Sequence, residues 1–100
     1  MSGDAVWFVY MVRSADGRLY TGVTTDPERR LSEHREAGTR PGTRGAKYFR
    51  GRSGLQMVFK KSVANRSTAQ KLEYRIKQLE KSRKEALVQG VVSLKQLFPE

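Results

Sequence analysis

The sequence contains no cysteine and only one histidine, His34, among its 100 residues. Without cysteine, a disulfide framework and a thiolate zinc site are both excluded. With a single histidine, a metal site that needs several imidazole ligands is excluded as well. Two common classes of metal site are therefore absent from this chain.

Long apolar segments are also absent. No apolar stretch approaches the roughly 18 residues of a membrane span. Residues 1–4 lack the positive start and the apolar centre of a signal peptide, so we expect a cytoplasmic protein that does not interact with a membrane. At 100 residues, with 37% hydrophobic residues, the chain is long enough for a modest core, which predicts one domain over residues 1–100.

Acidic residues are scarce relative to basic ones. Ten Asp and Glu face twenty Lys and Arg, which gives a net charge of +10. A balance this basic favours a polyanionic partner such as DNA or RNA. A basic surface that only maintains solubility is the alternative, but the charges are clustered, which favours nucleic acid.

Two strands are predicted near the start of the chain. Residues 6–12 are rich in aromatic and β-branched side chains, and residues 19–23 follow the turn signal Ser14-Ala15-Asp16-Gly17. The pattern predicts a β-hairpin, but the length of its loop is open.

The loop length decides which faces the tyrosines of this hairpin occupy. A two-residue turn would place Tyr10 and Tyr20 on opposite faces of the sheet. A loop of three residues with Gly17 in the left-handed conformation, or one of five, would pair Tyr10 with Gly22 and Val12 with Tyr20. Both phenols would then share a face, and Gly22 would leave space for the ring of Tyr10. We expect an odd loop, because a shared site requires it.

The rest of the chain predicts helices around one more strand. Asp26 and Pro27 open a helix that we expect to run to about Glu36 and to stop before Gly38. Further expectations are a loop over 37–46, a short helical turn over 46–50, a strand over 55–61 with Leu55, Met57 and Phe59 on one face, helices that begin with capping boxes at Ser67 and Ser82 and end near Lys81 and Gly90, and a last turn at Ser93. The order β-β-α-β-α-α predicts an α+β fold, in which helices flank a small three-stranded antiparallel sheet.

Positive charge is concentrated in the middle of the sequence. Residues 37–72 hold nine basic side chains and no acidic one. We predict that the most crowded part of this stretch binds nucleic acid, with guanidinium groups on phosphates and an aromatic ring stacked on an unpaired base, through Arg40, Arg44, Lys47, Tyr48, Arg50 and Arg52. A basic loop with no specific ligand is the alternative. Nothing in the pattern indicates that a base sequence is recognised.

Three further residues carry weak signals when each is taken alone. Arg30 and His34 are four positions apart and share one face of the predicted helix. Glu73 is spaced to pair with Lys77, yet it borders the apolar face of its helix, where an unpaired carboxylate is unfavourable. A divalent cation would relieve that cost, since one carboxylate with water and phosphate oxygens is a usual way to hold Mg²⁺.

The joint order of these residues is more specific than any one of them. A strand with Val9-Tyr10-Met11, a second with Tyr20-Thr21-Gly22, then Arg30, His34 and a helical Glu73 together resemble the GIY-YIG nuclease superfamily. The resemblance covers roughly residues 6–88. It is closest to the short stand-alone bacterial members, which share stretches like Tyr20 to Asp26 and Glu73 to Lys77.

The resemblance implies an activity and a role for each residue. Glu73 would hold one Mg²⁺ or Mn²⁺, and Arg30 would complement the charge on the phosphoryl oxygens. Tyr20 or Tyr10 would orient water and accept its proton, with His34 as a supporting or alternative acceptor. Nearby positive charge is expected to lower the pKa of the tyrosine that acts as base, so that the rate rises with pH above 7, whereas a plateau near 7 would indicate His34.

The implied function is that of a metal-dependent endonuclease which hydrolyses DNA in repair or processing. We expect it to be selective for structure or strandedness, with single-stranded or branched DNA as substrate and RNA not excluded. A nucleic-acid-binding module with little or no catalysis is the main alternative. A ribosome-associated basic protein would explain the charge but not the spacing of the candidate site residues.

Overall fold

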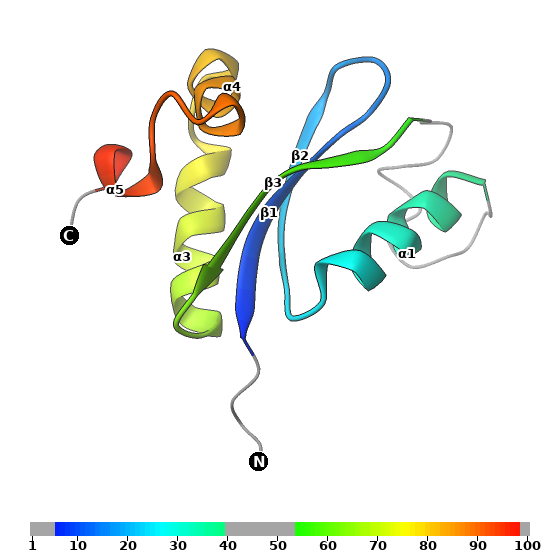
Figure 1. The fold of residues 1–100 in the computed structure, drawn as a ribbon, viewed down its shortest axis with the longest axis horizontal. Helices are drawn as coiled ribbons and strands as arrows, with labels where there is room; N and C mark the ends of the chain where they lie inside the picture. Colours follow the sequence, from blue (N-terminus) through cyan, green and yellow to red (C-terminus); the bar gives the residue numbers. More distant parts are fainter. Residues whose placement is uncertain (1–5, 40–53, 99–100) are drawn as a thin grey trace.

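The computed structural model describes residues 6–39 and 54–98. A three-stranded antiparallel sheet divides this part of the chain into two layers of helices (Figure 1). The elements are β1 (Trp7–Arg13), β2 (Leu19–Thr24), α1 (Pro27–Thr39), β3 (Gln56–Val63), α3 (Arg66–Lys77), α4 (Lys81–Gln89) and α5 (Leu94–Leu97). The predicted α+β order is therefore confirmed, with the last turn at Ser93 forming α5.

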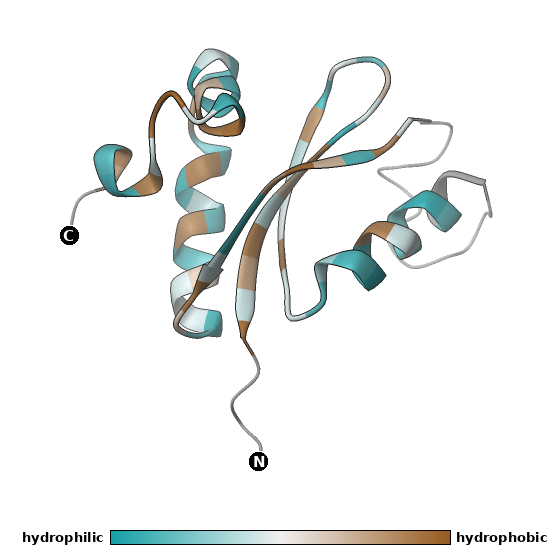
Figure 2. Ribbon diagram, viewed as in Figure 1, coloured by the Kyte–Doolittle hydropathy of each residue, from teal (hydrophilic) through white to brown (hydrophobic). Residues whose placement is uncertain are grey.

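The strand order is β2-β1-β3, so β1 is the central strand. Its apolar side chains are covered on both faces, as the sequence of this strand predicts. On one face Tyr10 and Val12 pack with Leu55 and Leu31. On the other face, a larger cluster around Val9 and Met11 includes apolar side chains of α3, α4 and α5. Figure 2 shows this hydrophobic content along β1 and in bands on α3.

The hairpin between β1 and β2 has the odd loop. Residues Ala15–Gly17 form the loop, with Gly17 N–H donating to the carbonyl of Ser14 at 2.8 Å and Ser14 N–H donating to that of Arg18 at 3.0 Å. Gly17 has a φ of +87°, the left-handed conformation that such a loop requires of its last residue. Tyr10 consequently pairs with Gly22, and both tyrosines lie on the face covered by α1.

The third strand departs from the predicted pattern. An irregularity between Met11 and Val12 in the pairing with β3 inserts one extra residue, Val58. Met57 therefore stays on the face of Tyr10, whereas Phe59 packs on the opposite face, in the cluster of Val9. The prediction that Leu55, Met57 and Phe59 share a face is wrong, because a β-bulge reverses side-chain direction beyond it.

The end of α1 and the start of α3 differ from the predictions. Asp26 caps α1 as expected, accepting from Arg29 N–H at 3.2 Å, but the helix continues through Gly38 to Thr39. A helix interior tolerates glycine at a cost of about 1 kcal/mol, so Gly38 does not end it. The cap of α3 is Asn65, which accepts from Thr68 N–H at 2.8 Å, and not Ser67.

The break between the two C-terminal helices lies earlier than predicted. The first of them, α3, ends at Lys77, and α4 begins at Lys81 after Glu80, which makes no side-chain capping bond. The predicted box at Ser82 therefore does not form. The final box at Ser93 does form, with both of its reciprocal hydrogen bonds. Within 6–39 and 54–98, no helix is both long and apolar enough to cross a bilayer.

Candidate active site

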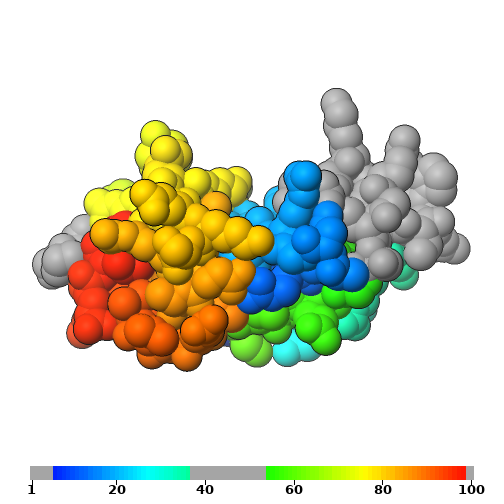
Figure 3. Space-filling model, turned by 90° about the horizontal axis from the view of Figure 1, so that it is seen from above, coloured from blue at the N-terminus to red at the C-terminus, as the bar shows by residue number. Residues whose placement is uncertain are grey.

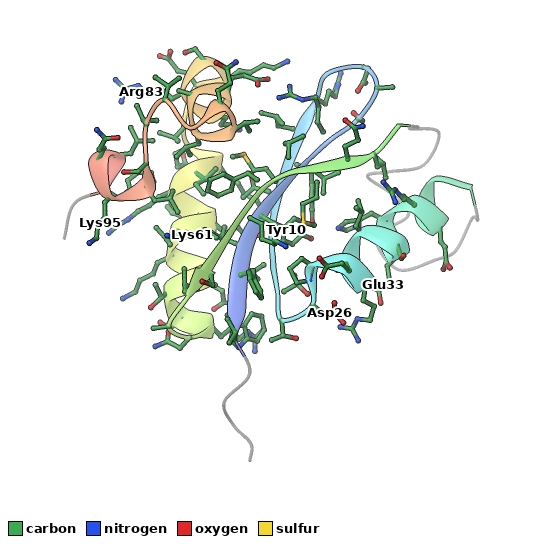
Figure 4. All side chains as sticks on the ribbon, viewed as in Figure 1. Tyr10, Asp26, Glu33, Lys61, Arg83 and Lys95 are labelled. Carbon is green, nitrogen blue, oxygen red and sulfur yellow. The ribbon has the colours of Figure 1, made fainter. Side chains whose placement is uncertain are left out.

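Three aromatic rings meet on the α1 face of the sheet. The ring centroids of Tyr20 and His34 are 5.3 Å apart, those of Tyr10 and His34 are 6.1 Å apart, and those of the two tyrosines are 6.5 Å apart. Tyr10 Oη and His34 Nε2 share a hydrogen bond of 2.9 Å. Two strands and a helix thus bring together three of the predicted residues, and the labelled Tyr10 in Figure 4 lies between the sheet and α1.

The members of this cluster differ in their access to solvent. Tyr10 and His34 are both fully buried, whereas Tyr20 is only partly buried. Burial disfavours a charged ring, so Tyr10 and His34 are both kept neutral at physiological pH. Of the two phenols, Tyr20 is the one that can meet a substrate or a water molecule from outside.

The pKa of the Tyr10 phenol is raised from its ordinary value to about 12. Burial is the main cause, and the neighbouring Tyr20 adds to it. The Arg30 guanidinium acts in the opposite direction, and the Glu73 carboxylate raises the pKa further. The expectation that positive charge would lower the pKa of the catalytic tyrosine is therefore wrong for Tyr10, because the desolvation of a buried phenolate outweighs the attraction of Arg30.

The pKa of His34 is lowered to about 4. Burial again comes first among the causes, and the positive charge of Arg30 lowers the pKa further, against a smaller opposite effect of Glu33. The imidazole is therefore neutral near pH 7. It can accept or donate one hydrogen bond at each nitrogen without carrying charge into the core.

Arg30 is held at the rim of the cluster by its own helix. Its Nη1 donates to Oε1 of Glu33 at 2.8 Å, three residues along α1, and its side chain is 22% exposed. This hydrogen bond holds the pKa of Glu33 below its ordinary value. Glu33 is not among the predicted site residues, although its i,i+3 spacing to Arg30 is a signal for the pair.

A polar hollow of about 370 Å³ lies beside Arg30. Trp7, Val23, Thr24, Thr25, Arg29, Arg30 and Glu33 line it. The hollow joins the end of β2 to the first turns of α1, next to the ring cluster. The sequence does not predict this hollow, because its shape depends on how α1 is oriented relative to the sheet.

Glu73 lies on α3, which contacts β2 and β1. Its side chain is 23% exposed, and Lys77 Nζ approaches Oε2 to 3.2 Å. The carboxylate is close enough to the ring cluster to act on the pKa of Tyr10. The predicted pairing with Lys77 and the predicted approach to the tyrosines are therefore both found.

The single carboxylate of Glu73 is compatible with an ion of the magnesium type. Within the described residues, no group of three or more His, Asp or Glu side chains converges. A single carboxylate that is partly open to solvent leaves most coordination positions to water and phosphate oxygens, which is how Mg²⁺ is commonly bound.

The residues predicted to bind nucleic acid lie outside the described residues, as does the predicted helical turn over 46–50: Arg40, Arg44, Lys47, Tyr48, Arg50 and Arg52.

A hydrogen-bonded link joins α1 to the residue before β3. Arg35 on α1 donates through Nε and Nη2 to the carbonyl of Leu55, at 3.2 and 3.0 Å. This link between α1 and the residue before β3 had no signal in the sequence.

Comparison with known proteins agrees with this geometry. The family model for the GIY-YIG catalytic domain matches residues 6–86. The chain belongs to the GIY-YIG family. The GIY-YIG catalytic domain is a nuclease domain, so membership indicates a nuclease-type fold and a nucleic-acid substrate in general.

Individual GIY-YIG relatives cover most of the chain. UPF0213 proteins of Yersinia pestis (strain Pestoides F) and Yersinia pseudotuberculosis serotype O:1b (strain IP 31758) are each 52% identical over 85 residues, which is 85% of this chain and 83% of theirs. The solution NMR structure of a UPF0213 protein from Bacillus halodurans is 36% identical, with a TM-score of 0.51 over 84% of this chain and 83% of its own. The chain is thus similar to a stand-alone group within the family.

Proposed function

We propose that this protein is a metal-dependent endonuclease that hydrolyses DNA phosphodiester bonds, selecting its substrate by structure or strandedness and acting in DNA repair or processing. The observation that carries the proposal is a convergence on one phenol. Tyr10 is hydrogen-bonded to His34, and its pKa is shifted by Tyr20, Arg30 and Glu73. Side chains from β2, α1 and α3 thereby act on one phenol of β1.

Each residue has a role that follows from its surroundings. Tyr20, the partly exposed phenol, is the proton acceptor for the attacking water. Tyr10 and His34 are positioning residues, because both are fully buried and neutral, and their hydrogen bond fixes the ring against which Tyr20 packs. Arg30, held by Glu33, complements the negative charge that grows on the phosphoryl oxygens.

Glu73 is the residue that would hold Mg²⁺ or Mn²⁺. The ion would supply Lewis-acid polarisation of the scissile phosphate and stabilisation of the leaving oxygen. Lys77 balances the carboxylate in the absence of the ion, since Nζ lies 3.2 Å from Oε2.

The test is cleavage of labelled single-stranded, duplex and branched DNA with Mg²⁺, with Mn²⁺ and with chelator. We expect the wild-type protein to cut at least one of these in the presence of metal, and Glu73→Gln to be inactive. Glu80→Gln is the matched control, because Glu80 is an exposed carboxylate that makes no side-chain capping bond. If the two variants behave alike, Glu73 has no special role. Binding by all proteins without cleavage by any would support the alternative of a binding module.

A further inference from the structure

A cationic surface adjoins the candidate site at the top of the molecule. It combines the turn of the β1–β2 hairpin with the junction of α3 and α4. Lys81 Nζ donates to the carbonyl of Gly17 at 2.9 Å and so joins the two elements. Figure 3 looks down on this face and shows the blue hairpin next to the gold residues where α3 meets α4. We define the turn-helix patch as Arg18, Lys77, Lys81 and Lys84.

The patch contains a hollow that is lined mainly by cations. Arg18, Lys81 and Lys84 surround a space of about 280 Å³, with Leu19 as its apolar wall. The cations are accessible, since the side chain of Arg18 is 65% exposed and that of Lys77 is 49% exposed. A hollow of this kind offers several positive groups to one extended anion.

Four acidic side chains lie near the patch: Glu73 pairs with Lys77, Glu80 is exposed at the start of α4, and Glu85 and Asp16 have other partners. Glu85 is bound by both Nη atoms of Arg13, at 2.5 and 2.6 Å. Asp16 accepts from Ser14 and faces Arg18 at 3.5 Å, so it offsets part of one charge only. Lys84 and Lys81 on the far side of the hollow keep the surface positive.

The patch is continuous with the candidate site through two elements. Lys77 pairs with Glu73, the proposed metal ligand. Arg18 lies in the hairpin turn, two residues before Tyr20 of β2. A nucleic-acid strand with its scissile phosphate at Tyr20 and Glu73 therefore has its next phosphates beside Lys77 and Arg18. Contacts of this kind position a backbone without reading its sequence.

We propose that the turn-helix patch binds the phosphate backbone of the DNA substrate on one flank of the cleaved bond. This inference rests on the proposed function and assigns one side of the substrate to the hairpin turn and α4. Lysine and arginine side chains at the surface suit this task, because both remain positively charged and neutralise phosphates whatever the base sequence.

The test is DNA binding in chelator, so that cleavage does not interfere. The variant Arg18→Gln/Lys81→Gln/Lys84→Gln is compared with Lys61→Gln/Lys71→Gln/Lys95→Gln, which removes the same charge from exposed positions on β3, α3 and α5. Figure 4 shows Lys61 and Lys95 on the side of the sheet away from Tyr10. Each lost phosphate contact lowers the slope of log affinity against log salt by about 0.9, and at 50 mM salt this amounts to about tenfold in affinity.

We expect the patch variant to lose about 2.7 from the salt slope, which is about 0.9 for each of three contacts, and to bind roughly a thousandfold more weakly than the control variant at 50 mM salt. The charge-conserving variant Arg18→Lys/Lys81→Arg/Lys84→Arg should retain wild-type affinity, which separates loss of charge from loss of folding. On a branched substrate, removing the duplex arms one at a time should erase the difference between patch and control variants for one arm only.

Equal losses in the two neutralised variants would show that only net charge matters and would overturn the inference. The same conclusion follows if the difference survives removal of either arm. These outcomes leave the proposed function intact, since cleavage dependent on Glu73 is measured separately. Failure of the wild-type protein to bind any DNA would instead overturn both proposals.

Discussion

The phenol of Tyr10 lies directly over the backbone of Gly22. A Cβ atom added at Gly22 would stand 2.6 Å from Oη and 2.8 Å from Cζ of that ring, closer than real Cβ contacts allow. Gly22 pairs with Tyr10 across the two strands, so the missing side chain is what lets the ring turn toward His34. The spacing of the second triplet, tyrosine then glycine two residues later, is thus a packing requirement of the site.

Gly22→Ala should therefore disable the site. The ring of Tyr10 is fully buried and cannot swing into solvent, so the new methyl group forces the ring or the strand to move. Overpacking of this kind costs about 1–3 kcal/mol of unfolding free energy. A shift of about 1 Å in a positioning group lowers turnover by about a hundredfold. Urea denaturation and cleavage rates measure the two effects.

The control for this prediction is the same substitution in a Tyr10→Phe background. Oη is the nearest atom to the added Cβ, so its removal should reduce the stability cost of Gly22→Ala. An undiminished cost in the double variant would mean that the ring carbons or the strand, and not the hydroxyl group, reject alanine.

The cleavage rate should rise with pH above 7. An ordinary phenol has a pKa near 10, so the fraction able to accept a proton grows about tenfold per pH unit. Tyr10, with a pKa of about 12, and His34, with a pKa of about 4, do not change charge between pH 6 and 9. Neither of these two rings can therefore produce the rise, and Tyr20→Phe should flatten it, because Tyr20 is the proposed proton acceptor.

The alternative, in which His34 is the proton acceptor, predicts a plateau near pH 7. A buried imidazole with a pKa of about 4 has no transition there, so the structure favours the tyrosine. A profile for the wild-type protein that is flat from pH 6 to 10 would contradict a tyrosine base. Tyr74→Phe, at an exposed tyrosine on α3, is the control for loss of a phenol.

His34 should make the fold sensitive to acid. Its folded pKa of about 4 lies below the value of 6.5 in an unfolded chain, so the unfolded state binds the proton more readily. Stability is therefore lost as pH falls from about 6.5 to about 4, by as much as about 3 kcal/mol for this shift. Urea titrations at pH 7.5 and 4.5 measure the loss. His34→Gln, which keeps a hydrogen-bonding side chain but cannot titrate, should show less of it.

Local signals in the sequence predicted the helices and strands and the placement of both tyrosines on one face of the sheet. Hydrophobic alternation and turn residues located β1 and β2, and the requirement that Tyr10 and Tyr20 share a face selected the odd loop that Gly17 forms. Asp26 and Ser93 were recognised as caps because each has its partner within three residues. Such features depend on neighbours in the chain, which is why they could be predicted.

Features that depend on distant packing could not be predicted. The bulge at Val58 divides Met57 and Phe59 between the two faces of the sheet, and its cause lies in the pairing with β1. The pKa of Tyr10 depends on how deeply α1 buries it, which no spacing reveals. The cap of α3 is Asn65 and not Ser67, two residues later, because both satisfy the same local rule and the sequence does not choose between them.

A bidentate ion pair joins the end of β1 to α4 and should stabilise the fold without contributing to catalysis. Arg13 donates through both Nη atoms to Glu85, and the two side chains are 29% and 24% exposed. The hydrogen bond from Arg13 is the main reason that the pKa of Glu85 lies below its ordinary value, so this contribution is lost as pH falls through the folded pKa. Glu85→Gln should lower the unfolding free energy by about 1 kcal/mol, since a two-pronged charged contact with limited exposure exceeds a typical surface pair.

The matched control is Asp16→Asn, which removes a carboxylate from the exposed pair with Arg18, whose side chains are 65% and 50% exposed. Its effect on stability should be smaller, although the loss of its bond to Ser14 is included in the measurement. Cleavage per folded molecule should be unchanged in Glu85→Gln, because Arg13 lies three residues from Tyr10 and on the other face of the sheet. A Glu85→Gln protein that is as stable as wild type but cuts more slowly would contradict the purely structural role and place α4 in the catalytic apparatus.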